Sequence, residues 1–349
     1  MSGAYACHDD AAGFFVRVTT INGETFSTNL SPIAVGADLW RLVVQKFAFN
    51  TTGKFPVLVF GKARLALQAG LAEQGVKSGD MLTLVCREVT PVEIEYILRK
   101  LMDDLGLEDV EELAFKSITR LTDVKSKLLH AFVKHDWPVA LQYLTFGREF
   151  NEVMTQVTLP AGLHSLTFGR QFNQDMTRVT LPAGLQSLTF GYSFNQDMTH
   201  VALPVGLQSL TFGWLFNQDM THVALPAGLQ SLTFGYSFNQ DMTQVTLPAG
   251  LQSLTFGVEF NQDMTQVTLP AGLQSLTFGY RFNQDMTQVT LPAGLQSLTF
   301  DVCFKQDMTQ VTLPAGLQSL TFGFFNNSTR LCQDRVAAAS LEVSSQSEQ

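Results

Sequence analysis

Charged side chains are scarce in this chain of 349 residues. Only 15% of its residues are Asp, Glu, Lys or Arg, and the net charge is -9. Binding of nucleic acid depends on clustered Lys and Arg side chains that face phosphates. The acidic balance therefore argues against nucleic acid as a partner, while the apolar share of 45% argues against wholesale disorder.

Long apolar runs and paired cysteines are also missing. No stretch reaches the roughly 20 apolar residues that cross a bilayer. The first residues, MSGAYACHDD, place acidic side chains where a secretory signal has a basic start. Since Cys7, Cys86, Cys303 and Cys332 lie far apart, neither a disulfide framework nor a zinc site is indicated. We expect a cytoplasmic protein with reduced thiols and no contact with a membrane.

Catalytic patterns are lacking as well. His164, His200 and His222 fall in different units and at two different positions of the repeat described below. No Ser/His/Asp or Cys/His set recurs, and the glycines follow the repeat and not the spacing of a phosphate-binding loop. We therefore expect no enzyme, no cofactor and no metal.

The sequence does contain a repeated unit, which recurs between residues 137 and 325. Leu181–Ala202, LPAGLQSLTFGYSFNQDMTHVA, is typical of it. A fixed period of 22 residues indicates short elements that stack on one another as a solenoid. The period is marked by Pro138, Pro160, Pro182, Pro204, Pro226, Pro248, Pro270, Pro292 and Pro314.

Two short apolar patterns in each unit predict two parallel strands per coil. Met176, Val179 and Leu181 make the first pattern, and Leu185, Leu188 and Phe190 make the second. Apolar and polar residues alternate at the end of each pattern, in Val179–Leu181 and in Ser187–Phe190, and a period of two is the period of a strand. The side chains expected to point inward are Val179, Leu181, Leu188 and Phe190.

Glycines are expected at the corners of each coil. Gly184 and Gly191 follow the two predicted strands, where the chain must turn with little steric room. In one unit Asp301 replaces the second glycine, and Asp is among the few residues that tolerate a left-handed backbone. We therefore expect Asp301 to adopt that conformation.

The consensus LPxxLxxLxFGxxFNQ closely resembles the FNIP-repeat family, a 22-residue branch of the leucine-rich repeats, and more distantly the BspA-like leucine-rich repeats. The match runs from about Pro138 to Phe322. This chain has Asp and Met where the family often has Pro and Ile after FNQ. The resemblance implies a C-terminal parallel β-solenoid of leucine-rich-like repeats over residues 137–325.

Residues 13–90 predict a small mixed domain with strands at Phe14–Thr20, Glu24–Leu30, Pro56–Phe60 and Met81–Arg87, and a helix after Asp38. The segments FFVRVTTINGETFSTNL, VLVFGKARL and VKSGDMLTLVCRE resemble the ubiquitin-like β-grasp family. Because the chain continues beyond these segments without a free Gly-Gly tail, the resemblance implies a built-in docking domain. A different small α+β domain is the alternative.

Residues 91–136 predict a helical connector. An apolar stripe runs from Ile94 to Leu105, and a last helix is expected at Asp123–His135. Such helices either cap the first coil or form a plain linker bundle. Residues 326–349 predict a partial cap followed by a disordered tail. The fold class expected for the whole chain is multidomain α+β.

Two polar columns follow from the repeat. The Asn column is expected to form a structural ladder through its amides, interrupted by Lys305. The Asp column is expected to form Asx turns or a solvated edge, with a calcium site as the alternative. The columns comprise Asn151, Asn173, Asn195, Asn217, Asn239, Asn261 and Asn283, and Asp175, Asp197, Asp219, Asp241, Asp263, Asp285 and Asp307.

Two positions between FG and FN vary from unit to unit, although almost everything around them is copied. Tyr, Trp and Arg are frequent there, and these residues dominate interface hot spots. We predict a non-enzymatic protein–protein interaction scaffold or adaptor that binds a protein partner along this row. The alternatives are drift at unconstrained sites and a structural or surface-binding solenoid, such as a calcium- or ice-binding one. The predicted partner-binding residues are Arg148, Arg170, Tyr192, Trp214, Tyr236, Glu259, Tyr280 and Arg281.

Overall fold

The computed structural model describes residues 14–20, 24–30, 55–60, 63–64, 80–87 and 115–323, together with isolated positions between 39 and 98. Two compact units divide the chain. The first comprises Met1–Thr119 and Pro138–Ala140, and the second comprises Arg120–Trp137 and Leu141–Gln349. The described helices include none that is long and apolar enough to cross a bilayer.

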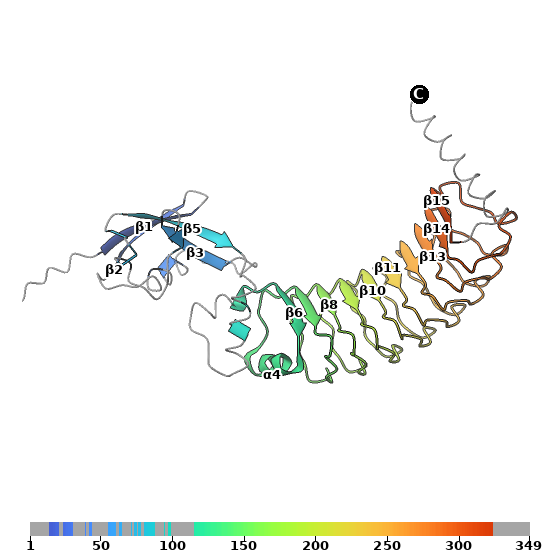
Figure 1. Ribbon diagram of the computed structural model, residues 1–349, viewed down its shortest axis with the longest axis horizontal. Coiled ribbons are helices and arrows are strands. Elements are labelled where there is room, and N and C mark those ends of the chain that lie inside the picture. Colours follow the sequence, from blue (N-terminus) through green and yellow to red (C-terminus); the bar gives the residue numbers. More distant parts are fainter. Residues whose placement is uncertain are drawn as a thin grey trace, which may run out of the picture. The chain divides into compact units, whose positions relative to one another are not determined.

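The first unit contains a five-stranded sheet in the order β2-β1-β5-β3-β4 (Figure 1). β1 pairs antiparallel with β2 and parallel with β5, and β3 pairs antiparallel with β5. Each of the four predicted strands is present close to its expected bounds, and β4 is an addition. The strands are β1 Phe14–Thr20, β2 Thr25–Leu30, β3 Phe55–Phe60, β4 Ala63–Arg64 and β5 Met81–Arg87.

Buried aliphatic side chains form the core of this unit. Val16 and Val18 of β1, Leu82 of β5 and the helical residues Leu39 and Val43 are fully buried. The helix predicted after Asp38 is therefore helical at its described positions. The hairpin turn predicted at residues 22–23 lies outside the described residues.

The second unit is a parallel β-solenoid whose strands follow one another in chain order in a single ten-stranded sheet. Equivalent residues pair from coil to coil, as Leu210 does with Leu232. Figure 1 shows the strands side by side along the inner side of a curved stack. They are β6 Arg120–Val124, β7 Tyr143–Phe146, β8 Ser165–Thr167, β9 Ser187–Thr189, β10 Ser209–Thr211, β11 Ser231–Thr233, β12 Ser253–Thr255, β13 Ser275–Thr277, β14 Ser297–Phe300 and β15 Ser319–Phe322.

The prediction of two strands per coil is wrong, because the described coils each contain one strand. In the segment Met176–Leu181 the backbone N–H of Val179 donates to the carbonyl of Met176 at 3.0 Å. The N–H of Thr177 donates to the carboxylate of Asp175 at 2.8 Å. These local bonds occupy amides that a ladder would need, and competition of this kind is typical of Asp and Thr.

Phenylalanine rings fill the interior of the stack. Phe190 and Phe194 stack within one coil at 3.8 Å between ring centroids, and Phe190 stacks on Phe212 of the next coil at 5.8 Å. The side chains predicted to point inward are buried, including Leu188 at 0% exposure and Val179 at 4%. Since every coil shares its aromatic contacts with both neighbours, the array has one continuous core.

Close approach of neighbouring coils explains the glycine after each strand. A Cβ atom added at Gly191 would lie 2.0 Å from the carbonyl oxygen of Gly169. The expected left-handed backbone of Asp301 is wrong, because among the described non-glycine residues only Asp123 and Asp136 have a positive φ. The coil that carries Asp301 instead has a looser ladder, with 3.1 Å between the Cys303 nitrogen and the Tyr280 oxygen.

The cap of the first coil combines a strand with a helix. The helix predicted at residues 123–135 is α4, Ser126–His135, whose Leu128 and Phe132 are buried. The ring of Phe132 stacks on Trp137 at 4.3 Å. Residues Arg120–Val124, predicted as part of a helical connector, form β6 and pair with β7. The Leu–Thr pair in β6 repeats the Leu–Thr pair of the later strands, and this was the sequence signal for a further coil.

Candidate interaction surface

The variable positions lie in the turn that follows the strand of each coil. We define the variable row as the two residues that follow the glycine after each strand, from Arg148–Glu149 onward. In the last such coil Asp301 replaces the glycine, and the row ends at Val302–Cys303. The backbone of this row forms a ladder of its own: the N–H of Ser193 donates to the carbonyl of Arg170 at 2.8 Å, and later coils repeat the bond. The ladder therefore fixes the spacing of the variable side chains.

Four side chains of the row form a continuous stack. The guanidinium of Arg170 lies 4.6 Å from the ring centroid of Tyr192. The rings of Tyr192 and Trp214 are 5.4 Å apart, and those of Trp214 and Tyr236 are 4.1 Å apart and tilted by only 6°. Because the ring faces contact one another, the stack presents ring edges, including the Tyr hydroxyls and the indole N–H.

Apolar exposure is concentrated on the same row. Trp214 is 43% exposed, its neighbour Leu215 is 41% exposed and Tyr280 is 44% exposed. Val302, at the end of the row, is 39% exposed, whereas Val153 and Val205 are exposed at positions off the row. An exposed apolar patch with aromatic anchors is typical of an interaction site.

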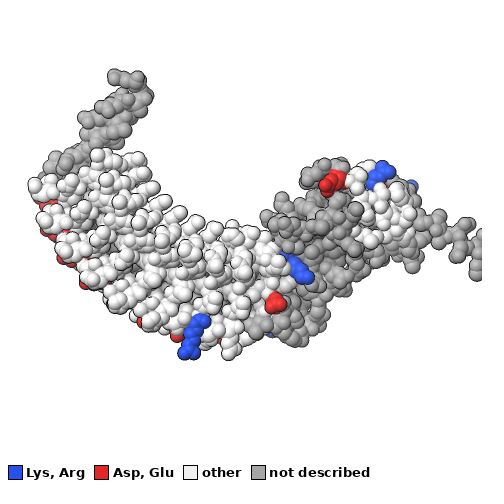
Figure 2. Space-filling view, turned by 180° about the vertical axis from the view of Figure 1, so that it is seen from behind, with Lys and Arg blue, Asp and Glu red and all other residues white. Residues whose placement is uncertain are grey.

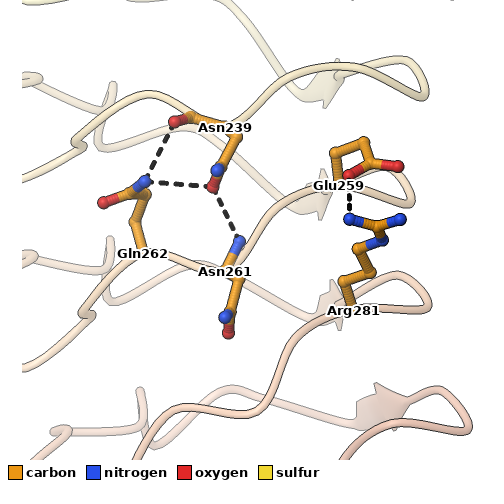
Figure 3. A network of polar contacts seen from close by, with 5 residues as sticks. All are labelled: Asn239, Glu259, Asn261, Gln262 and Arg281. Atoms are coloured by element: carbon orange, nitrogen blue, oxygen red, sulfur yellow. Dashed lines mark hydrogen bonds and ion pairs between the residues drawn. The ribbon is translucent and has the colours of Figure 1, made fainter.

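Charged groups flank the aromatic stack on both sides along the row. Arg281 pairs with Glu259 of the preceding coil at 3.0 Å (Figure 3). At the other end Arg148 lies 3.5 Å from Glu149, and that carboxylate also accepts a hydrogen bond from Gln171. The structure therefore brings all eight predicted partner-binding residues onto one row.

A column of amides runs beside the row and ties the coils together. The Oδ1 atom of Asn239 accepts the backbone N–H of Asn261 at 2.9 Å and the Nε2 group of Gln262 at 3.0 Å (Figure 3). The same bonds recur along the column, and the backbone N–H of Lys305 still donates to Asn283 at 2.8 Å. The Gln partners were missed from the sequence, although a Gln follows the Asn in most units.

The Asp column forms Asx turns at the outer edge of the stack, where red patches recur in Figure 2. The Thr199 hydroxyl donates to Asp197 at 2.6 Å and the Thr199 backbone N–H at 2.8 Å. These two bonds lower the pKa of the Asp197 carboxyl, because they stabilise its charged form. Within the described ranges no group of three or more His, Cys, Asp or Glu side chains could hold a metal ion.

Comparison with known proteins first defines the class of protein. The stacked parallel strands and the 22-residue period are those of a repeat solenoid that resembles leucine-rich-repeat proteins. The FNIP Repeat model matches residues 150–193, 172–215, 194–237, 238–281 and 282–325, so the chain belongs to the FNIP-repeat family. No curated protein matches the sequence.

Solved structures with some similarity fall into two groups. CroV588, described as a circular LRR protein, is 36% identical over 61% of this chain, with a TM-score of 0.48. The chain spans only 35% of the length of CroV588. An internalin from Listeria monocytogenes is 14% identical, covering 67% of this chain and 95% of its own, with a TM-score of 0.35.

The other group concerns a quarter of the chain. The C-terminal ubiquitin-like domain of human 2'-5'-oligoadenylate synthetase-like protein is 18% identical over 25% of this chain and 94% of its own, with a TM-score of 0.21.

Proposed function

We propose that this protein is a non-enzymatic interaction scaffold that binds a protein partner along the variable row. The observation that carries the proposal is the partly exposed stack of Arg170, Tyr192, Trp214 and Tyr236, which lies at two positions that vary from coil to coil. Buried aromatic and Arg anchors supply most of the binding energy in protein interfaces.

Pre-organisation supports this proposal. Each stacked ring is held by the ring of the neighbouring coil, and its backbone is held by a bond of 2.8 or 2.9 Å from the next coil. A side chain that is already ordered loses less conformational entropy when a partner binds. The row can therefore present its anchors at a small cost in ordering.

The proposal includes a second docking module in residues 13–90. The hairpin of β1 and β2, the buried helix residues and the parallel pairing of β1 with the last strand β5 support a ubiquitin-like domain there. A scaffold with two modules can hold two proteins at once. No particular partner follows from the sheet alone.

A structural solenoid without a specific partner is the second candidate. Its support is the near-identity of the coils outside the variable row, since the same Asn ladder and Asx turn recur along the stack. In that case the row has no role beyond its position, and replacing its aromatic residues leaves every association of the protein unchanged.

Truncation of the aromatic stack separates the two candidates. The variant Trp214→Ala/Tyr236→Ala removes two stacked rings, and Val205→Ala is the matched control because Val205 is 79% exposed and the equivalent position of the preceding coil is Ala183. Affinity capture with the full chain is followed by mass spectrometry of bound proteins. Partners lost with the double variant and retained with Val205→Ala support the scaffold. Identical sets of partners with both variants refute it.

A further inference from the structure

We propose that the partner of the variable row is a second copy of this chain. The two copies dock antiparallel about a two-fold axis that passes through the coil of Trp214 and Leu215. The inference rests on the proposed function, since it uses the same row as the binding surface. It adds the identity of the partner and the register in which it binds.

Equal coil spacing makes a second copy a fitting partner. Parallel strands lie about 4.8 Å apart, and the row repeats once per coil along the whole sheet. A second copy has the same period, so a match made at one coil continues at the next without drift. A two-fold axis uses the same surface on both copies, as most homodimers do.

The charges of the row are complementary in this register. Coils at equal distances on either side of Trp214 face each other, so the coil of Arg170 meets the coil of Glu259. One coil further out, Glu149 meets Arg281. Each half of the interface therefore contains two pairs of coils whose opposite charges face each other.

The uncharged members of the row are compatible with the same register. Trp214 and Leu215 meet their own copies on the axis, and Tyr192 meets Tyr236. The guanidinium of Arg148 falls opposite the ring of Tyr280, which is a favourable cation–π pairing. The adjacent exposed side chains of Trp214 and Leu215 are thus covered at the centre of the interface, where hot spots cluster.

Two alternative arrangements bring like charges together. With the axis between the coils of Trp214 and Tyr236, Arg170 meets Arg281 and Glu259 meets an uncharged turn. A parallel arrangement places Arg170 against Arg170 and Glu259 against Glu259. Registers centred on the coil of Tyr192 or of Tyr236 bring neither like nor opposite charges together. Because like charges in contact oppose association and opposite charges favour it, the register centred on Trp214 is favoured over all of these.

The side chains concerned are accessible. The side chains of Arg148, Glu149 and Arg281 are 68%, 69% and 60% exposed, and that of Glu259 is 25% exposed. The carboxylate of Glu259 already pairs with Arg281 of its own chain, so a second cation would share it. Since the row is only two residues wide, the interface falls at the small end of specific interfaces, and we expect a dissociation constant in the micromolar range.

Curvature does not oppose this arrangement. The row follows the ends of the strands, along one side of the curved stack, and the strands lie on its inner side (Figure 1). A two-fold axis directed at the inner side carries one curved stack onto the other along their length. The whole row can therefore be in contact at once.

A charge exchange in the full chain tests the inference. We measure sedimentation equilibrium in reducing buffer from about 1 to 100 μM, which brackets the weak affinity expected of a small interface, for the unchanged chain, Arg170→Glu, Glu259→Arg and the double variant. Reductant excludes a disulfide through Cys303, which lies on the row. The control is Arg178→Glu, which makes the same charge change at an exposed position outside the row.

We expect the unchanged chain and Arg178→Glu to dimerise alike. Each single row variant weakens dimerisation by about tenfold or more, because truncating or reversing one member of a close charge pair commonly costs this much. The double variant recovers most of the loss. A role confined to one chain predicts the opposite, because the double variant then loses both the Arg170–Tyr192 contact and the Glu259–Arg281 pair.

A monomer at every concentration, or a double variant no better than the single ones, overturns the second-copy inference. The proposed function survives that result if the affinity capture shows other partners that depend on Trp214 and Tyr236. It fails as well if no association depends on the row.

Discussion

The two glycines of one coil give a prediction that separates close backbone packing from turn geometry. A Cβ atom at Gly191 would lie 2.0 Å from the carbonyl oxygen of Gly169 and 2.5 Å from its carbon. A Cβ atom at Gly184 would lie 3.7 Å from its nearest neighbour, the carbonyl oxygen of Ala161, which is an ordinary contact. Neither glycine has a positive φ. The two Gly→Ala substitutions are therefore matched in chemistry and differ in space.

The expected effects have opposite signs. Gly191→Ala forces two backbones apart, and overpacking of this kind costs about 1 to 3 kcal/mol, with the upper end expected because backbone cannot rotate away. Gly184→Ala stabilises the folded state by about 0.4 to 1 kcal/mol, because alanine restricts the unfolded chain. In the coil of Asp301, which has a side chain at this position, the hydrogen bond between coils is longer, at 3.1 Å from the Cys303 nitrogen to the Tyr280 oxygen, and the coil keeps its fold.

Urea unfolding followed by circular dichroism measures the difference between these two variants. The midpoint for Gly191→Ala is expected well below that of the unchanged chain, and the midpoint for Gly184→Ala at or above it. Hydrogen exchange localises the effect, since amides of the coils on either side of Gly191 are expected to exchange faster. Equal midpoints for the two variants would refute the argument that coil contact, and not turning, requires the glycine.

Three further predictions concern the ladder, the Asx turns and the cap. Asn217→Ala leaves the backbone N–H of Asn239 without its acceptor. The variant is expected to lower the free energy of unfolding, measured in urea, by about 1 to 2 kcal/mol. A loss below about 0.5 kcal/mol would show that the Asn ladder does not stabilise the stack. The folded pKa of Asp197 lies below the ordinary value of 3.8, so the stability that its turn contributes is present above that pH and is lost as pH falls through the folded pKa. Asp197→Asn is expected to weaken the acid dependence in melts between about pH 2 and 5, and an unchanged acid limb contradicts this. Phe132→Ala in the cap is expected to cost about 3 to 5 kcal/mol and to speed hydrogen exchange in the first coils, whereas uniform exchange along the stack would contradict a capping role.

Most of the solenoid fold could be predicted from the 22-residue period of the sequence. The 22-residue period, the inward Leu188 and Phe190 and the amide column were all readable from the repeat, because stacking turns sequence spacing directly into contacts between coils. The N-terminal strands were readable from alternation and turn residues for a similar reason, since each depends on local chemistry.

The errors arise where local bonds compete with a pattern. Val179 and Leu181 alternate as in a strand, yet Asp175 captures the amide of Thr177 and a turn results. The role of Gly191 depends on a contact with the preceding coil, which no single unit reveals. The strand β6 was not predicted from the sequence, because its coil shares little with the repeat beyond Leu121 and Thr122.

The stack on the variable row shows a similar limit. The sequence placed Tyr192, Trp214 and Tyr236 in one row, but their rings could equally have splayed apart into solvent. The distances of 5.4 and 4.1 Å between their centroids show that the three rings stack on one another.

Photo-crosslinking from the variable row tests the central claim most directly. A photoreactive amino acid replaces Leu215, which is 41% exposed on the row, or Val205, which is 79% exposed off it. Irradiation of the full chain among its natural partners is followed by mass spectrometry. Crosslinks to protein from position 215 and few or none from position 205 are predicted, with a product of twice the chain mass if the partner is a second copy. Equal crosslinking from both positions would contradict the claim that the row is the binding surface.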